Sequence, residues 1–162
     1  MSKSIVKKAI HATAFLNEPI ECNKSFSRGI KITFGGMNIL FISGTASINK
    51  KGKTYYAEDF LAQTKRTFDN ISALLSSEGA RWADIVQTRC YLKNIERDYA
   101  MFNAHRNRFY KKQKLCPFPA SVCISANLCR PELLVEIEAI AVIKAQKRKS
   151  KIPIHLSQPN PA

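Results

Sequence analysis

The sequence predicts an α+β sandwich in which two helices pack on one face of a mixed β-sheet. Two stretches repeat apolar residues at helical spacing, and several others alternate apolar and polar residues as strands do. Their order along the chain is strand, strand, helix, strand, helix, strand, strand. The strand pairs at both ends are therefore expected to form antiparallel hairpins. The length of 162 residues suits a single domain.

The first predicted hairpin lies in the N-terminal third of the chain. Residues 25–34 alternate in character, and residues 39–42 form an apolar run. The sequence Gly-Gly-Met-Asn at 35–38 predicts a tight turn between them. Residues 9–16 are expected to add a short strand before this hairpin.

Two helices and one strand follow the hairpin. Residues 57–79 carry the clearest helical periodicity, with Asp59 expected in the first turn and Gly79 after the last. Residues 85–93 alternate as a strand, and a second helix is predicted from about 97 to 112. The core stripe of the second helix is expected to comprise Tyr99, Phe102 and Phe109, with Met101 nearby.

The closing strand, residues 133–141, carries two carboxylates on one face. Its alternation places the apolar side chains of Val135 and Ile137 on one side and Glu136 and Glu138 on the other. Side chains two residues apart on a strand are separated by roughly 7 Å, so these acids repel each other. Two interpretations stay open: the acids pair with cations on a neighbouring strand, or their pKa values are raised for chemistry at a site.

The charge balance favours an anionic partner. The chain has 26 Lys and Arg against 12 Asp and Glu, a net charge of +14. Such a field attracts nucleic acid, acidic membranes or small polycarboxylates, and also improves solubility. No strip of alternating basic and aromatic residues supports nucleic-acid binding, and no apolar run is long enough to cross a membrane. A small anionic substrate and a cytoplasmic location are the expectations.

Cysteine and histidine spacing predicts no metal site and no cofactor. The five cysteines are odd in number and include no pair at CxxC spacing, and the three histidines are scattered.

Residues 1–143 are expected to form the domain. Residues 144–162 are basic, contain three prolines and are expected to form a mobile tail. Because the strands are apolar on both faces, oligomerisation is expected to cover the free face of the sheet.

Six motifs, in order, are similar to those of the RidA/YjgF family of reactive-intermediate (enamine and imine) deaminases, also labelled endoribonuclease L-PSP. They are Ile42-Ser43-Gly44, Asp84-Ile85-Val86, Tyr91-Leu92-Lys93, Phe102-Asn103-Ala104, Phe118-Pro119-Ala120 and residues 135–141. The resemblance covers residues 25–143. It implies a chorismate-mutase-like fold, a homotrimer, and active sites in clefts between subunits.

The resemblance carries functional residues onto seven positions. It implies substrate contacts at Ser43, Gly44, Asn103 and Cys123, and a water held by Glu136. At two positions this sequence departs from the family. Phe26 stands where the family has a tyrosine, and Ser121 stands where it has the arginine that holds the substrate carboxylate. The absence of that arginine predicts little deamination of ordinary 2-imino acids.

A second resemblance leads to the main functional expectation. Residues 44–48 and 129–138 look like the catalytic half of chorismatases, which hydrolyse the enol ether of chorismate. In that scheme Glu136 protonates the substrate and Arg130 binds its carboxylate, with Arg89 as the second choice and Cys129 exposed in the cleft. The expected activity is hydrolysis of a small anionic enol ether such as chorismate. A divergent enamine or imine deaminase and a non-catalytic binder of an anionic metabolite are the alternatives; RNA binding or cleavage is the least favoured.

Overall fold

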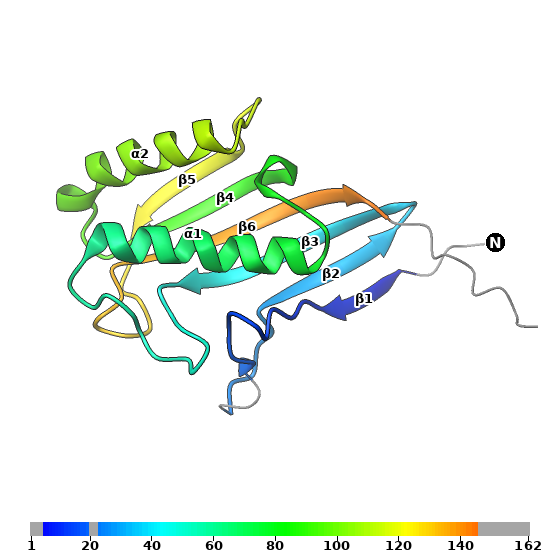
Figure 1. Ribbon diagram of the computed structural model, residues 1–162, viewed down its shortest axis with the longest axis horizontal. Coiled ribbons are helices and arrows are strands. Elements are labelled where there is room, and N and C mark those ends of the chain that lie inside the picture. The colour runs from blue at the N-terminus through cyan, green and yellow to red at the C-terminus, as the bar shows by residue number, and fades with distance from the viewer. Residues whose placement is uncertain (1–4, 20–22, 146–162) are drawn as a thin grey trace, which may run out of the picture.

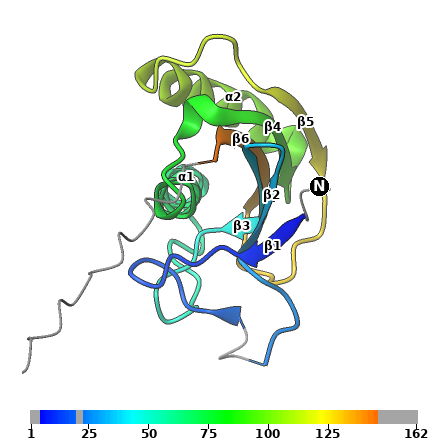
Figure 2. The same ribbon diagram turned by 90° about the vertical axis from the view of Figure 1, so that its right-hand side faces the viewer.

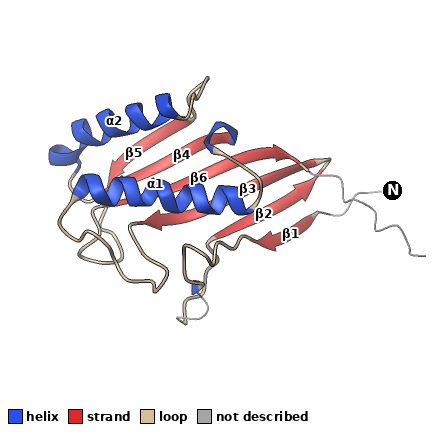
Figure 3. Cartoon of the chain, viewed as in Figure 1, coloured by secondary structure: helices blue, strands red, loops and turns tan. Residues whose placement is uncertain are grey.

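The computed structural model of the protein describes residues 5–19 and 23–145, and it confirms the α+β prediction. A six-stranded sheet with the order β1-β2-β3-β6-β4-β5 carries two long helices on one face (Figures 1 and 2). Figure 3 separates the helices from the strands by colour. The elements are β1 (Val6–Ala9), β2 (Gly29–Phe34), β3 (Met37–Ala46), α1 (Phe60–Ser77), the short 3₁₀ helix η2 (Trp82–Asp84), β4 (Ile85–Leu92), α2 (Ile95–Lys112), β5 (Ala120–Ser125) and β6 (Val135–Lys144).

The N-terminal strands form an antiparallel meander, β1 to β3. Gly35 and Gly36, with φ angles of 58° and 83°, alone form the turn, because Phe34 already pairs with Met37. The expected four-residue turn is therefore two residues too long. A strand over residues 9–16 was also the wrong expectation, since β1 ends at Ala9 and pairs with β2.

The C-terminal strands do not form the expected hairpin. β5 lies at the edge of the sheet, parallel to β4, and β6 pairs antiparallel with β3 on one side and β4 on the other. The physical reason lies in burial: β6 has one fully buried face, which suits a central strand, whereas β5 is mostly exposed. β6 extends to Lys144, which was assigned to the tail, and residues 146–162 of that tail lie outside the described residues.

Local capping sets the ends of the helices. Asp59 precedes α1 as its N-cap, accepting from Ala62 N, rather than lying in the first turn. Gly79, with φ of 72°, ends α1 as predicted. In α2 the predicted core stripe is partly wrong: Tyr99 and Met101 are exposed, and the buried aromatic residues are Phe102 and Tyr110. Neither helix of the described chain is long and apolar enough to cross a membrane.

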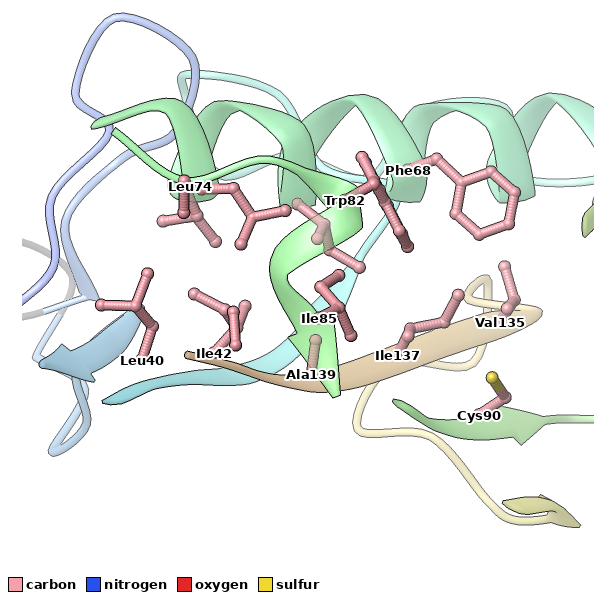
Figure 4. Packing of buried hydrophobic residues seen from close by; sticks show 14 of the residues in the cluster. Leu40, Ile42, Phe68, Leu74, Trp82, Ile85, Cys90, Val135, Ile137 and Ala139 are labelled. Atoms are coloured by element: carbon pink, nitrogen blue, oxygen red, sulfur yellow. The ribbon is translucent and has the colours of Figure 1, made fainter. Parts of the chain in front are cut away.

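One hydrophobic core lies between the sheet and the helices. Figure 4 shows how side chains from β3, β4 and β6 meet those of α1 and the η2 segment; the labelled residues are Leu40, Ile42, Phe68, Leu74, Trp82, Ile85, Cys90, Val135, Ile137 and Ala139. The predicted inward face of residues 133–141 is confirmed, since its apolar side chains are almost completely buried.

The opposite face of the sheet carries an apolar row. Ile30, Phe41 and Ile140 lie side by side on β2, β3 and β6, and Phe41 is 40% exposed. Both helices lie on the other side of the sheet (Figure 2). An exposed apolar row of this kind is consistent with coverage by further copies of the chain, which stays a prediction.

Candidate functional site

A cavity of about 490 Å³ lies beside the end of β3 and the start of β6. Its lining combines the end of β3, the first residues of β6 and the loops that precede β2 and β6. Six of the residues singled out in the sequence line it: Phe26, Ser43, Gly44, Cys129, Arg130 and Glu136. The tertiary structure thus gathers residues from three separate stretches of the chain into one cavity.

A β-bulge presents Ser43 and Gly44 to the cavity. The register between β3 and β6 shifts between Ile42 and Thr45, so the two residues between them are displaced from regular pairing. Ser43 Oγ donates to the carbonyl of Ser27 at 2.7 Å, which ties the bulge to the segment before β2. Gly44 is required by close approach, because an added Cβ would lie 2.1 Å from Oε1 of Glu136.

Glu136 is a partly buried carboxyl whose pKa is shifted. Burial, and next the charge of Glu138, raise the pKa of its carboxyl above the ordinary value. Cys129 Sγ lies 4.0 Å from Glu136 Oε2, at the exposed side of the cavity. A carboxyl of this kind can hold a proton closer to neutral pH and exchange it with a bound molecule.

Arg130 is held at the rim of the cavity by neutral groups. Its Nη1 donates to the carbonyl of Gly52 at 2.7 Å and to Thr54 Oγ1 at 3.3 Å. No ion pair within 4 Å joins it to an acid of the described residues. Arg130 and Glu136 thus line the same cavity, and the assignment of Arg130 as the carboxylate anchor stays a prediction.

The loop that carries Arg130 is anchored to α1 by a buried amide. Gln63 is fully buried; its Nε2 donates to the carbonyl of Glu132 at 2.8 Å, and its Oε1 accepts from Leu134 N at 2.9 Å. Sequence reasoning missed Gln63, whose only signal was a polar residue on the apolar face of a helix.

Arg89 and Glu138 form an ion pair outside this cavity. Arg89 Nη1 lies 3.2 Å from Glu138 Oε2, and the Tyr91 hydroxyl donates to Glu138 Oε1 at 3.2 Å. Of the two interpretations of the acidic pair, the cross-strand ion pair thus holds for Glu138. Arg89 lines a hollow of about 300 Å³ on the free face of the sheet, which Ser43 also borders.

The remaining predicted residues form a second group at the α2–β5 edge of the sheet. Asn103 lies on α2, and Ser121 and Cys123 lie on β5, in register with Thr88 and Cys90. Burial, and next the neighbouring Cys90, raise the pKa of Cys123 to about 11, so its thiol is neutral at physiological pH. None of the three lines the 490 Å³ cavity.

Two arginines near these groups were not singled out from the sequence. Arg28, 8% exposed, lines the cavity and donates to the backbone and side chain of Asn17 at 3.0 and 2.8 Å. Arg106 contacts both Asn103 and Ser121. The available signals were a cation in an alternating strand pattern for Arg28, and a position one turn after Asn103 for Arg106. Within residues 5–19 and 23–145, no group of three His, Cys, Asp or Glu is placed to hold a metal ion.

Comparison with known proteins gives consistent matches. The profile of the family described as Endoribonuclease L-PSP matches residues 16–143. A RutC family protein of Pasteurella multocida is 34% identical over 105 residues, which cover 65% of this chain and 80% of that protein. The 2-iminobutanoate/2-iminopropanoate deaminase of Escherichia coli is 32% identical over 105 residues, again 65% and 80% of the two chains. The crystal structure of the YjgF gene product of E. coli has a TM-score of 0.67 at 29% identity, covering 83% of this chain and 98% of that chain.

Proposed function

Since the chain belongs to the endoribonuclease L-PSP family, as its motifs predicted, we propose that it is a deaminase of small 2-imino and 2-enamino acids. This reverses the order of the expectations from sequence, because the deaminase was the alternative to chorismate hydrolysis. The relative named for 2-iminobutanoate and 2-iminopropanoate supports the change, and none of the matches described above is named for chorismate. The observation that carries the proposal is the Glu136 carboxyl, half-buried with a raised pKa in a cavity that Arg130 borders.

The reaction requires a group that moves protons next to the substrate nitrogen. Water adds to the C2 carbon of the imine, and its proton passes to the Glu136 carboxylate. Glu136 then returns this proton to the nitrogen, which gives the carbinolamine. A second proton passes from the hydroxyl group through Glu136 to the nitrogen, the C–N bond breaks, ammonia leaves, and the 2-oxo acid remains. For an enamine, the protonated carboxyl of Glu136 first donates its proton to C3, which gives the iminium ion and leaves Glu136 as the carboxylate. A raised pKa suits both directions of transfer, because it brings the pKa of the carboxyl closer to neutral pH.

The substrate class follows from charge. A 2-imino acid carries one carboxylate, and the cationic residues that line the cavity, Lys24, Arg28 and Arg130, attract such an anion without being assigned as its anchor. The net charge of +14 raises the local concentration of such anions. A planar guanidinium matches a carboxylate with two parallel hydrogen bonds, which fixes the position of the adjacent imine carbon.

The complete site is proposed to form between copies of the chain. The predicted residues fall into two groups, one at the cavity beside β3 and β6 and one at the α2–β5 edge, and β4 lies between β6 and β5. If both groups serve one substrate, they must come from different subunits. A cyclic homotrimer with three equivalent sites satisfies this requirement and covers the apolar face of the sheet.

Hydrolysis of an enol ether such as chorismate is the second candidate. The observation that favours it is that Glu136 and Arg130, the two residues which that mechanism requires, line one cavity. Protonation of an enol-ether carbon and of an enamine carbon is the same task for Glu136.

The direct test compares the two substrates in parallel. 2-Iminobutanoate, generated in solution from an amino acid by an oxidase, is expected to give faster ammonia release in the presence of the protein than in its absence. Chorismate is expected to give no pyruvate. Pyruvate release without acceleration of imine hydrolysis would instead assign the second candidate, and inactivity on both would leave a binding role for the cavity.

A further inference from the structure

We propose that the edge between α2 and β5 is a carboxylate-binding half-site whose anchor is Arg106. The inference rests on the proposed deaminase function for the identity of the carboxylate, but its structural argument is independent. It concerns a residue for which neither the sequence motifs nor the comparisons supply a role.

The guanidinium of Arg106 is held in place on three sides. Its Nη2 donates to Asn103 Oδ1 at 2.7 Å, and its Nη1 donates to Ser121 Oγ at 3.1 Å. Its carbon Cζ lies 5.2 Å from the centre of the Phe102 ring. These contacts come from α2 and β5 together, so they fix a long and otherwise mobile side chain at the junction of the two elements.

The charge of Arg106 has no acidic partner within the described residues. Arg81, Arg89 and Arg97 each form an ion pair with an acid, whereas Arg106 appears in none of the ion pairs. The neighbouring titratable groups are the thiols of Cys90 and Cys123 and the phenol of Tyr110, whose pKa values are all raised, chiefly by burial. Because these groups are neutral at physiological pH, they do not neutralise the positive charge of Arg106. That charge can therefore attract an incoming anion.

The small side chain at position 121 makes this arrangement possible. Ser121 is exposed and contributes only a hydroxyl, which accepts from both Thr88 Oγ1 and Arg106 Nη1 at 3.1 Å. A longer side chain there would compete for the space that the guanidinium fills. The family resemblance implies an arginine on the strand at this position, and here the helix supplies the guanidinium instead. The proposal therefore removes the reason for which little deamination of 2-imino acids was expected from the absence of that arginine.

The other arginines considered for this role are placed less well. Arg89 is paired with Glu138 on the free face of the sheet, and Arg130 lies in the other group, at the cavity that Glu136 also lines. Arg106 is the cation that lies among Asn103, Ser121 and Cys123.

Binding of 2-oxobutanoate, measured by titration calorimetry, tests the inference without requiring turnover. Replacing a charge-assisted contact should raise Kd about 10- to 100-fold in Arg106→Ala. Arg106→Lys should show an intermediate loss, because it keeps the charge but not the planar fork. Arg108→Ala, an exposed arginine on the same helix, is the matched control and should leave Kd unchanged. The methyl ester of the same acid should bind weakly and equally to the wild type and to Arg106→Ala.

A second variant tests the half-site without removing Arg106, so the inference does not depend on whether Arg106→Ala folds. Ser121→Glu keeps the Arg106 residue but supplies an internal carboxylate that competes for its guanidinium, so it should weaken binding of 2-oxobutanoate as strongly as Arg106→Ala. Equal Kd values for Arg106→Ala and Arg108→Ala, or no binding by the wild type, would overturn the inference. If binding depends on Arg106 but the wild type does not accelerate imine hydrolysis, the half-site stands and the deaminase proposal fails. If hydrolysis is accelerated and Arg106→Ala leaves kcat/KM unchanged, the deaminase stands and the half-site fails.

Discussion

The Glu136 carboxylate occupies the space in which a side chain at position 44 would begin. A Cβ on Gly44 would lie 2.1 Å from Glu136 Oε1 and 2.9 Å from its carboxyl carbon. The bulge in β3 and the absence of a side chain at Gly44 therefore act together to seat the acid of β6 against the backbone of β3. This contact connects a local feature of the chain with the group to which we assign proton transfer.

Gly44→Ala is expected to displace that carboxylate and to lower kcat by at least about 100-fold, the range that general acid-base catalysis contributes. The fold should persist, since the displaced atoms belong to a side chain at a cavity. Rates of ammonia release and far-ultraviolet circular dichroism measure the two effects. Gly35→Ala is the control, because its Cβ meets nothing within 4 Å and costs only ~1–2 kcal/mol of turn strain. Full activity in Gly44→Ala would show that the position of Glu136 is not critical.

Glu136→Gln is expected to reduce turnover by about 10²- to 10⁴-fold while binding of 2-oxobutanoate remains. The same change should stabilise the protein at neutral pH. Burial raises the pKa of Glu136 in the folded state, so the folded protein binds that proton more tightly than the unfolded chain. Its contribution to stability is full below the ordinary pKa of about 4.5 and falls as the pH rises through the folded-state value. Thermal unfolding of both proteins across this range should show the gain in Tm at neutral pH shrinking in acid; a constant difference would contradict the assignment.

Gln63→Leu is expected to destabilise the protein by more than about 2 kcal/mol. The change keeps the apolar contacts of the side chain but leaves the Leu134 N–H and the Glu132 carbonyl without their partner. Because these groups belong to the loop of Arg130, KM for the imine should rise as well. Urea unfolding and steady-state kinetics measure both effects. Gln113→Leu, at an exposed position after α2, should change neither.

Phe41→Glu is expected to prevent assembly. Phe41 lies in the apolar row between Ile30 and Ile140, and a carboxylate there would have to be buried if copies of the chain pack on this face. Light scattering should give the mass of a trimer for the wild type and of a monomer for the variant. Phe15→Glu, at a similarly exposed position in the segment before β2, should leave the mass unchanged. A monomeric wild type would remove the argument for a shared site.

Mixing two inactive variants tests whether the sites are shared. Glu136→Gln disables the group beside β3 and β6, and Ser121→Glu disables the α2–β5 edge. If each site combines one group from each of two subunits, random trimers refolded from an equal mixture should recover about one quarter of the wild-type activity, because one interface in four pairs two intact groups. Activity no greater than that of the separate variants would place both groups in the same subunit or outside the site.

The sequence by itself determined the local structure and the family. The alternation of residues 133–141 identified the buried face of β6, helical spacing located α1 and α2, and the Gly35-Gly36 pair marked the hairpin turn. These features depend on neighbouring residues, whose periodicity reports which side of an element meets the core. The expected first strand at 9–16 was wrong, because apolar residues in a short segment show that it meets the core but not that it forms a strand.

Only the tertiary structure decided which elements are neighbours. Periodicity gives a strand its faces but not its partners, so the insertion of β6 between β3 and β4 could not be read from the chain. That insertion pairs Glu138 with Arg89 and leaves Glu136 beside Gly44. The two acids, which have the same pattern in the sequence, thus have different environments in the structure. The contact of Arg106 with Ser121 likewise depends on how α2 packs beside β5, since 15 residues separate the two along the chain.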